Sequence, residues 1–290
     1  MTSSAATPLM IHRRPSAGAL VRGYTGRAGP GFVVGVVLIL TLLAIGLIAP
    51  LLLGSALATN SANVFAAPGG EHLLGTDRYG RDILSRAVSA IRIDLALGVG
   101  IAVAALVIGS LIGVASAYFG GLLDEIVMRG TDVVMAFPGF VFALMLAAFT
   151  GGNLFWAAIG VVIGATPNFV RLTRARALAE RSKEYVAAAR VSGTPHLVVV
   201  VRHILPNSIP PAFVQGTITA GWAMLDIAAL SFLGLGVQPP TPEWGAMISE
   251  GYGDMVTGVW WTAVFPGLFL LTSVLSFQLI GDGMDRAVKR

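Results

Sequence analysis

Side chains that could perform chemistry are scarce in this sequence, and none of them falls into a familiar catalytic pattern. Neither Lys183 nor Lys289 belongs to a G-x-x-x-x-G-K-[ST] loop, which excludes ATP hydrolysis by a phosphate-cradling loop of that type. The metalloprotease pattern H-E-x-x-H and the nucleophile patterns G-x-S-x-G and S-x-x-K are also absent. Cysteine is missing, so disulfides and thiolate chemistry are excluded. An enzyme is therefore not expected.

One carboxylate lies inside an apolar run. Asp226 is the only charged residue between positions 209 and 235. An ionisable side chain at membrane depth usually lines a water-filled cavity or pairs with a neighbouring helix. Asp226 is therefore a candidate for lining a pathway, and a structural hydrogen bond between helices is the alternative.

A second candidate lies in a basic loop, residues 171–207, whose centre has a helical pattern. Ser182 is a candidate N-cap, and Glu184 falls in the first turn, where the helix dipole favours an acid. Gly193 and Pro195 provide a stop signal. The pattern predicts a helix of about ten residues.

This predicted helix carries a narrow stripe of mostly small side chains. Glu184, Ala187, Ala188 and Val191 follow the spacing i, i+3, i+4 and i+7, which places them on one face. Small residues let another surface approach the backbone closely, and Arg190 beside the stripe could orient a partner. The alternative is a basic helix lying on anionic lipid. The lack of a large apolar face weakens that alternative.

The composition shows which elements must position these residues. Hydrophobic residues make up 55% of the 290 and charged residues only 12%, with a mean hydropathy of +0.80. A soluble domain carries roughly 25% charged residues. The apolar residues come in long runs, each able to cross a hydrocarbon core of about 30 Å. We therefore expect an all-α polytopic membrane protein.

About six transmembrane helices are predicted. One charge-poor stretch, residues 133–170, is interrupted by Gly151, Gly152 and Asn153, and its length fits two spans joined by a tight turn. The other spans are expected within residues 32–53, 95–123, 209–235 and 255–281.

The distribution of arginine and lysine predicts the orientation. With the N-terminus inside, all but four of these residues fall in cytoplasmic segments, as the positive-inside rule requires. This predicts a cytoplasmic tail (1–31), the first span, an external loop (54–94), a five-span domain (95–285) and a cytoplasmic tail (286–290). The alternative is that the first apolar run is a signal peptide cleaved near residues 56–58, but 22 residues is long for such a segment.

Three stretches of the sequence resemble a known family. The sequence EYVAAAR at 184–190, with Gly193 and then HILPN at 203–207, resembles the EAA loop of permease subunits in binding-protein-dependent ABC importers. HLLGTDRYGRDILSR at 72–86 and LSFLGLGVQPP at 230–240 resemble the C-type permease subunit of the dipeptide and oligopeptide branch. The resemblance extends from the first span to the C-terminus.

This resemblance implies the type I ABC importer permease fold, a place in the bacterial inner membrane and a mechanism. The EAA segment would be a coupling helix seated in a groove of a cytoplasmic ATPase, with Glu184, Ala187, Ala188 and Gly193 as coupling positions and Arg190 flanking them. The implied partners are a second homologous permease, two ATPase subunits that bind ATP and Mg, an external substrate-binding protein and membrane lipid. No nucleic acid, cofactor or metal of its own is expected. The implied cargo is a short peptide, although related systems import nickel chelates or haem.

The external loop offers a further candidate site. Residues in the glycine- and aspartate-rich turn could contact the binding protein, or the turn could merely order the loop. These residues are Gly75, Thr76, Asp77, Gly80, Arg81 and Asp82.

Two other functions compete with the importer permease. An ion-coupled secondary transporter should show paired broken helices or several buried carboxylates, and this sequence offers only Asp226. A membrane scaffold would need no ATPase partner. Three glycine pairs four residues apart, beginning at Gly31, Gly109 and Gly160, predict only close helix packing.

Overall fold

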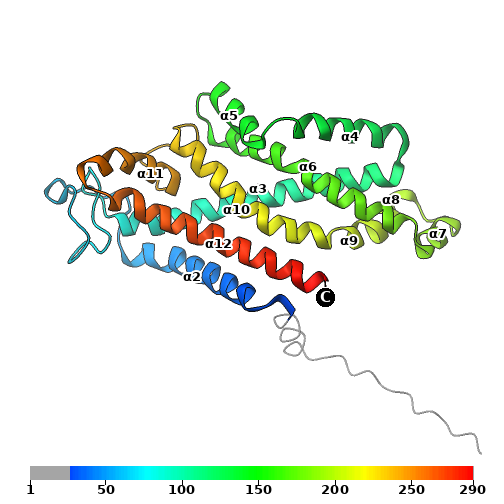
Figure 1. Ribbon diagram of the computed structural model, residues 1–290, viewed down its shortest axis with the longest axis horizontal. Coiled ribbons are helices and arrows are strands. Elements are labelled where there is room, and N and C mark those ends of the chain that lie inside the picture. The colour runs from blue at the N-terminus through cyan, green and yellow to red at the C-terminus, as the bar shows by residue number, and fades with distance from the viewer. Residues whose placement is uncertain (1–26, 290) are drawn as a thin grey trace, which may run out of the picture.

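The computed structural model describes residues 27–289, which form a bundle of helices without a β-strand (Figure 1). The predicted tail, residues 1–31, lies almost entirely outside the described residues. The elements are α2 (Pro30–Leu52), η1 (Ser61–Asn63), α3 (Ile83–Phe119), α4 (Gly121–Met135), α5 (Gly139–Phe149), α6 (Leu154–Arg181), α7 (Glu184–Val191), α8 (His196–Val199), η2 (Val200–Ile204), α9 (Leu205–Ser208), α10 (Pro210–Phe232), α11 (Trp244–Tyr252), η3 (Gly253–Thr257) and α12 (Trp261–Lys289).

The predicted all-α architecture with about six spans is confirmed. Within the described part of the chain, five helices are long and apolar enough to cross a membrane: α2, α3, α6, α10 and α12. The sixth candidate is the pair α4 and α5, whose axes are bent by 78°. The predicted turn at residues 151–153 separates α5 from α6.

The third span is not the continuous helix that residues 133–150 suggested. Residues 133–135 end α4, and α5 begins only after Pro138. Proline lacks an amide hydrogen and disfavours helical geometry at the residue before it, so the chain bends here. The 11 residues of α5 cover only about 16 Å at 1.5 Å per residue, too little to cross a bilayer alone.

Helix α3 also differs from its prediction, because it begins at Ile83, well inside the expected external loop (54–94). The charged side chains of its first turns have partners. Arg86 Nη2 donates to Glu250 Oε2 at 2.7 Å, and Arg92 Nε donates to the Gly46 carbonyl at 2.7 Å. A helix can therefore continue through this charged segment.

The bundle has two distinct ends in Figure 1. Loop 54–82 and α11 gather at one end, and α7 and α8 lie at the other, on the side where α2 begins and α12 ends. The segment just before α2 is joined to α12, because Arg286 Nε donates to the Ala28 carbonyl at 3.2 Å. This arrangement agrees with termini that share one side of the membrane, which stays a prediction.

Glycines bring α3 and α6 into close contact. A Cβ on Gly109 would approach the Phe169 Cβ to 2.5 Å, and a Cβ on Gly113 would approach the Val170 carbonyl oxygen to 2.4 Å. The pair beginning at Gly160 packs in the same way against Ala143 and Gly139 of α5. The glycine pairs therefore serve close helix packing, as predicted.

We expect Gly113→Val to destabilise the chain by about 1–3 kcal/mol, because its side chain would overlap the α6 backbone. Gly100→Val is the matched control on the same helix, since no atom outside its immediate neighbours lies within 4 Å of a Cβ there. Thermal unfolding of both purified variants in detergent measures the difference. Equal melting temperatures would contradict the proposed packing role.

Candidate functional site

Helix α7 is the centre of the predicted coupling site, and its inner face holds it against the ends of the spans. Val186 is fully buried in a cluster with Val114, Ala117 and Ile204, among others. Arg181 Nη1, at the end of α6, donates to the Ala117 carbonyl of α3 at 2.9 Å. Val186 therefore packs α7 against the ends of α3 and α6, which are themselves joined by this hydrogen bond.

A polar network supports the same face. The Tyr185 hydroxyl donates to Glu180 Oε2 at 2.7 Å, and Asn207 Nδ2 donates to the His203 carbonyl at 2.6 Å and to the Tyr185 hydroxyl at 3.3 Å. The bond to the Glu180 carboxylate raises the pKa of the Tyr185 phenol. These bonds join α7 to α6 and to the segment that leads into α10.

The start of α7 differs from the prediction. Ser182 is the C-cap of α6, and its hydroxyl donates to the Ala179 carbonyl at 2.9 Å. Lys183 occupies the N-cap position without a side-chain capping bond, and α7 has eight residues instead of about ten. The prediction failed because α6 continues to Arg181, ten residues past the start of the expected loop.

The predicted stripe points away from the protein. Glu184, Ala187, Ala188 and Val191 are all exposed, and the exposed fraction of Val191 reaches 90%. Gly193 ends the helix with φ +76°, a left-handed conformation that favours glycine. The chain thus presents a firmly held, small-residue surface to whatever lies beyond this end.

Arg190 does not belong to this surface. Its guanidinium lies over the ring of Tyr118, 4.8 Å from the centroid, and the side chain is half-buried. The cation–π contact attaches α7 to the end of α3. Arg190 therefore holds α7 in place and does not present a charge to a partner beside the stripe.

The outer motif, residues 75–82, forms a tight turn within an ion-pair cluster. Asp77 Oδ2 accepts from Arg81 Nε at 2.5 Å, and Arg81 Nη2 lies 3.1 Å from a Glu250 oxygen in α11. Asp82 caps α3 by accepting from the Ser85 amide at 2.8 Å. The motif therefore ties the external loop to α11 and begins α3.

Most of the residues proposed to contact a binding protein are covered. Gly75, Thr76, Asp77, Gly80 and Arg81 are buried, and Asp82 is partly exposed. A Cβ on Gly80, which has φ +67°, would lie 1.8 Å from the Asn60 carbonyl oxygen. This burial favours the alternative that the motif orders the loop. The exposed neighbours Arg78 and Tyr79 are better placed to touch another protein.

Sequence reasoning missed a buried carboxylate near this end. Glu243 is fully buried and caps α11, accepting from the amides of Gly245 at 3.0 Å and Ala246 at 2.7 Å. Burial raises the pKa of Glu243, although these donors oppose the shift. Asp94 of α3, also buried, accepts from the Trp244 amide at 3.3 Å. The sequence did contain a signal for this role, because Glu243 directly precedes the residues that form α11.

Asp226 faces a cavity of about 360 Å³ between α5, α6 and α10. Its lining includes the polar side chains of Asn168, Gln215 and Thr219, as well as Trp222. The structure therefore places Asp226 beside open space, and its role as a pathway residue stays a prediction. No hydrogen bond or ion pair joins it to another residue between 27 and 289.

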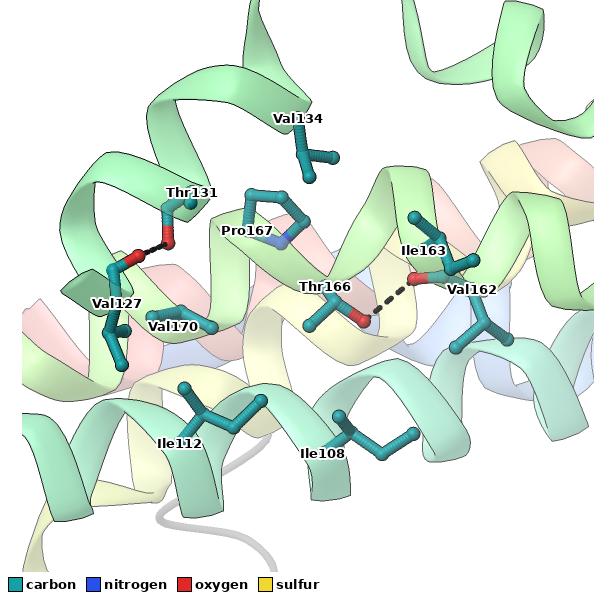
Figure 2. Close-up of a pocket in the computed structure, with 11 residues that line it drawn as sticks. Ile108, Ile112, Val127, Thr131, Val134, Val162, Ile163, Thr166, Pro167 and Val170 are labelled. Atoms are coloured by element: carbon teal, nitrogen blue, oxygen red, sulfur yellow. Dashed lines mark hydrogen bonds between the residues drawn. The ribbon is translucent and has the colours of Figure 1, made fainter. Parts of the chain in front are cut away.

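A second cavity of about 370 Å³, between α3, α4 and α6, has different chemistry (Figure 2). Aliphatic side chains such as Ile108 and Val134 surround it. The hydroxyls of Thr131 and Thr166 each donate at 2.7 Å to a carbonyl one turn back, on Val127 and Val162. This cavity offers no free side-chain polar group to a solute, unlike the one beside Asp226.

Comparison with known proteins identifies the family. Residues 105–290 match the family described as the inner membrane component of binding-protein-dependent transport systems. The chain belongs to this family. All of α7, α10 and α12, as far as they are described, lies within the matched region. The chain is thus a transport permease subunit, and a binding protein works with it.

Curated relatives of this permease cover most of its length. The dipeptide transport system permease protein DppC of Alkalihalophilus pseudofirmus is 38% identical over 88% of this chain and 84% of its own. DppC of Escherichia coli is 41% identical over 75% and 72%. The glutathione transport system permease protein GsiD of Pectobacterium atrosepticum is 39% identical over 76% and 73%. The resemblance to the dipeptide branch of ABC importer permeases is confirmed.

Proposed function

We propose that this chain forms half of the translocation pathway of an ATP-driven importer for dipeptides and oligopeptides in the bacterial inner membrane. A second, homologous permease supplies the other half. Two cytoplasmic ATPase subunits supply the energy, and an external binding protein delivers the peptide. The chain itself is non-catalytic, and ATP and Mg are bound by the partner subunits.

The observation that carries this proposal is the exposed stripe of α7. Its side chains are small and unobstructed, while the opposite face is locked onto α3 and α6. Such a surface can fit into a groove of a partner subunit, and movement of that subunit would then move the spans. Glu184, Ala187 and Ala188 are the contact positions, and Gly193 sets the direction in which the chain leaves the helix.

The relatives support a peptide as cargo, since those named above carry dipeptide or glutathione transport in their names. A nickel chelate or haem is the alternative cargo for the same machinery. An ion-coupled secondary transporter is disfavoured, because Asp226 is the only carboxylate that faces the polar cavity within the described residues.

Reconstitution of the complete importer in proteoliposomes tests the proposal. We expect uptake of a labelled tripeptide that requires ATP and the binding protein and that persists when ionophores collapse ion gradients. Excess unlabelled dipeptide should compete, whereas nickel chelates and haem should not. Uptake without ATP, driven by an ion gradient, would contradict the ATPase-coupled mechanism. Competition by haem or a nickel chelate alone would contradict the peptide cargo.

A further inference from the structure

The cavity beside Asp226 is built largely on one face of α10. Gln215, Thr219, Trp222 and Asp226 follow the spacing i, i+4, i+7 and i+11, and all four line the cavity. Asn168 of α6 contributes an exposed amide from across it. A polar stripe along a membrane-spanning helix is costly against lipid, so it marks a face meant for water, a solute or another polar surface.

Asp226 differs from three other carboxylates on α3 and α4. Asp124 pairs with Arg174 at 2.6 Å and Asp132 with Arg171 at 2.5 Å, while Asp94 accepts a backbone amide. Asp226 has no such partner between residues 27 and 289, and the residues that line its cavity include no lysine or arginine. The cavity therefore contains one uncompensated negative group together with two amides.

A cation with hydrogen-bonding groups would complement this lining. The volume of about 360 Å³ falls within the 300–1,000 Å³ typical of small-ligand sites. The Trp222 ring, more than half exposed, offers an aromatic face that also attracts cations. The apolar cavity in Figure 2 has none of these properties.

We propose that this cavity receives the positively charged groups of a peptide in transit. Asp226 accepts hydrogen bonds from the ammonium of the peptide N-terminus or of a lysine side chain. The amides of Asn168 and Gln215 bond to the peptide backbone, and Trp222 covers the cation. The inference rests on the proposed function, since it assigns one part of the same pathway to one chemical group of the cargo.

The test compares three peptides of equal length, Ala-Lys-Ala, Ala-Gln-Ala and Ala-Glu-Ala, in the reconstituted importer. Peptide-loaded binding protein is kept in excess, so that its affinity does not limit the rate. We expect Asp226→Asn to lower the uptake ratio of the lysine peptide to the glutamate peptide about tenfold. Asp226→Glu should keep the ratio within about twofold. Asp285→Asn, which makes the same change on α12 outside the cavity lining, should leave it unaltered.

A second variant guards against failure of Asp226→Asn to assemble. Asn168→Asp adds a carboxylate to the cavity and should raise the lysine-to-glutamate ratio. If neither variant changes the lysine-to-glutamate uptake ratio, the inference is overturned, even if all three uptake rates fall together. Such a uniform fall would indicate a structural role for Asp226, for example a salt bridge to the second permease, which would affect all peptides alike. If the wild-type importer takes up none of the three peptides, the proposed function fails and the inference fails with it.

Discussion

Replacing Ala188 with tryptophan should reduce ATP-driven uptake at least tenfold while the chain still folds and inserts. Ala188 is exposed on the outer face of α7, so a larger side chain there can extend away from the protein. The indole would instead hold a docking surface several ångströms away from the helix backbone. Loss of that close approach should break the link between ATP hydrolysis and the movement of α3 and α6.

Uptake, ATPase activity and subunit recovery should be measured on the same purified complexes. Either loss of the ATPase subunits or continued hydrolysis without uptake would support docking at the stripe. Ala175→Trp is the matched control, since Ala175 is equally an exposed alanine but lies on α6. Normal uptake and recovery in Ala188→Trp would show that α7 is not the coupling surface.

Glu184→Lys tests the same surface through charge and should give a loss in the same direction. Gly193→Trp would be less informative, because any side chain there is strained by the φ of +76°. A defect in that variant could come from the backbone and not from the contact.

Hydropathy predicted most of the fold because each span is an apolar run with a physical reason to be helical. In lipid, backbone groups must be satisfied within the segment, so a run such as residues 32–53 has few alternatives. The bend between α4 and α5 was hidden from hydropathy, since both sides of it are apolar. Pro138 is the local signal in the sequence, but a proline indicates a bend without giving its angle.

The start of α3 could not be predicted for a different reason. Charged residues in 82–94 suggested a loop, because an unpaired charge disfavours a membrane helix. Their neutralising partners include Glu250, more than 150 positions away in the sequence. Pairing over such a separation appears only in the folded chain.

The candidate site was predicted unevenly. The stripe of α7 followed from spacing alone and is exposed as expected. Arg190 has the spacing of a flanking charge, yet the Tyr118 ring that covers its guanidinium belongs to another helix. The outer motif was recognised as a unit, but burial of its side chains depends on contacts with α11 and α12. For example, Trp261 Nε1 donates to the Thr76 carbonyl at 3.1 Å.

Removing the Glu250 carboxylate should produce the largest loss of stability at the outer end. Glu250 pairs with Arg81 and with Arg86, and the exposed fractions of these two side chains are 5% and 1%. Without Glu250, two buried guanidinium groups would share Asp77 alone, 2.5 Å from Arg81 Nε but 3.9 Å from Arg86 Nε. Breaking a buried pair from one side typically costs about 3–5 kcal/mol, so Glu250→Ala should lower the melting temperature clearly.

Glu125→Ala is the control, because it removes the same side chain from the exposed pair with Arg129 and should have little effect. Limited proteolysis should locate the damage, with new cleavage in loop 54–82 and around α11 while α7 stays intact. Delivery of peptide should fall as well, because this loop and α11 form the end opposite α7, the proposed coupling helix (Figure 1). Unchanged melting temperature and proteolysis in Glu250→Ala would mean that the ion pairs do not hold the outer end together.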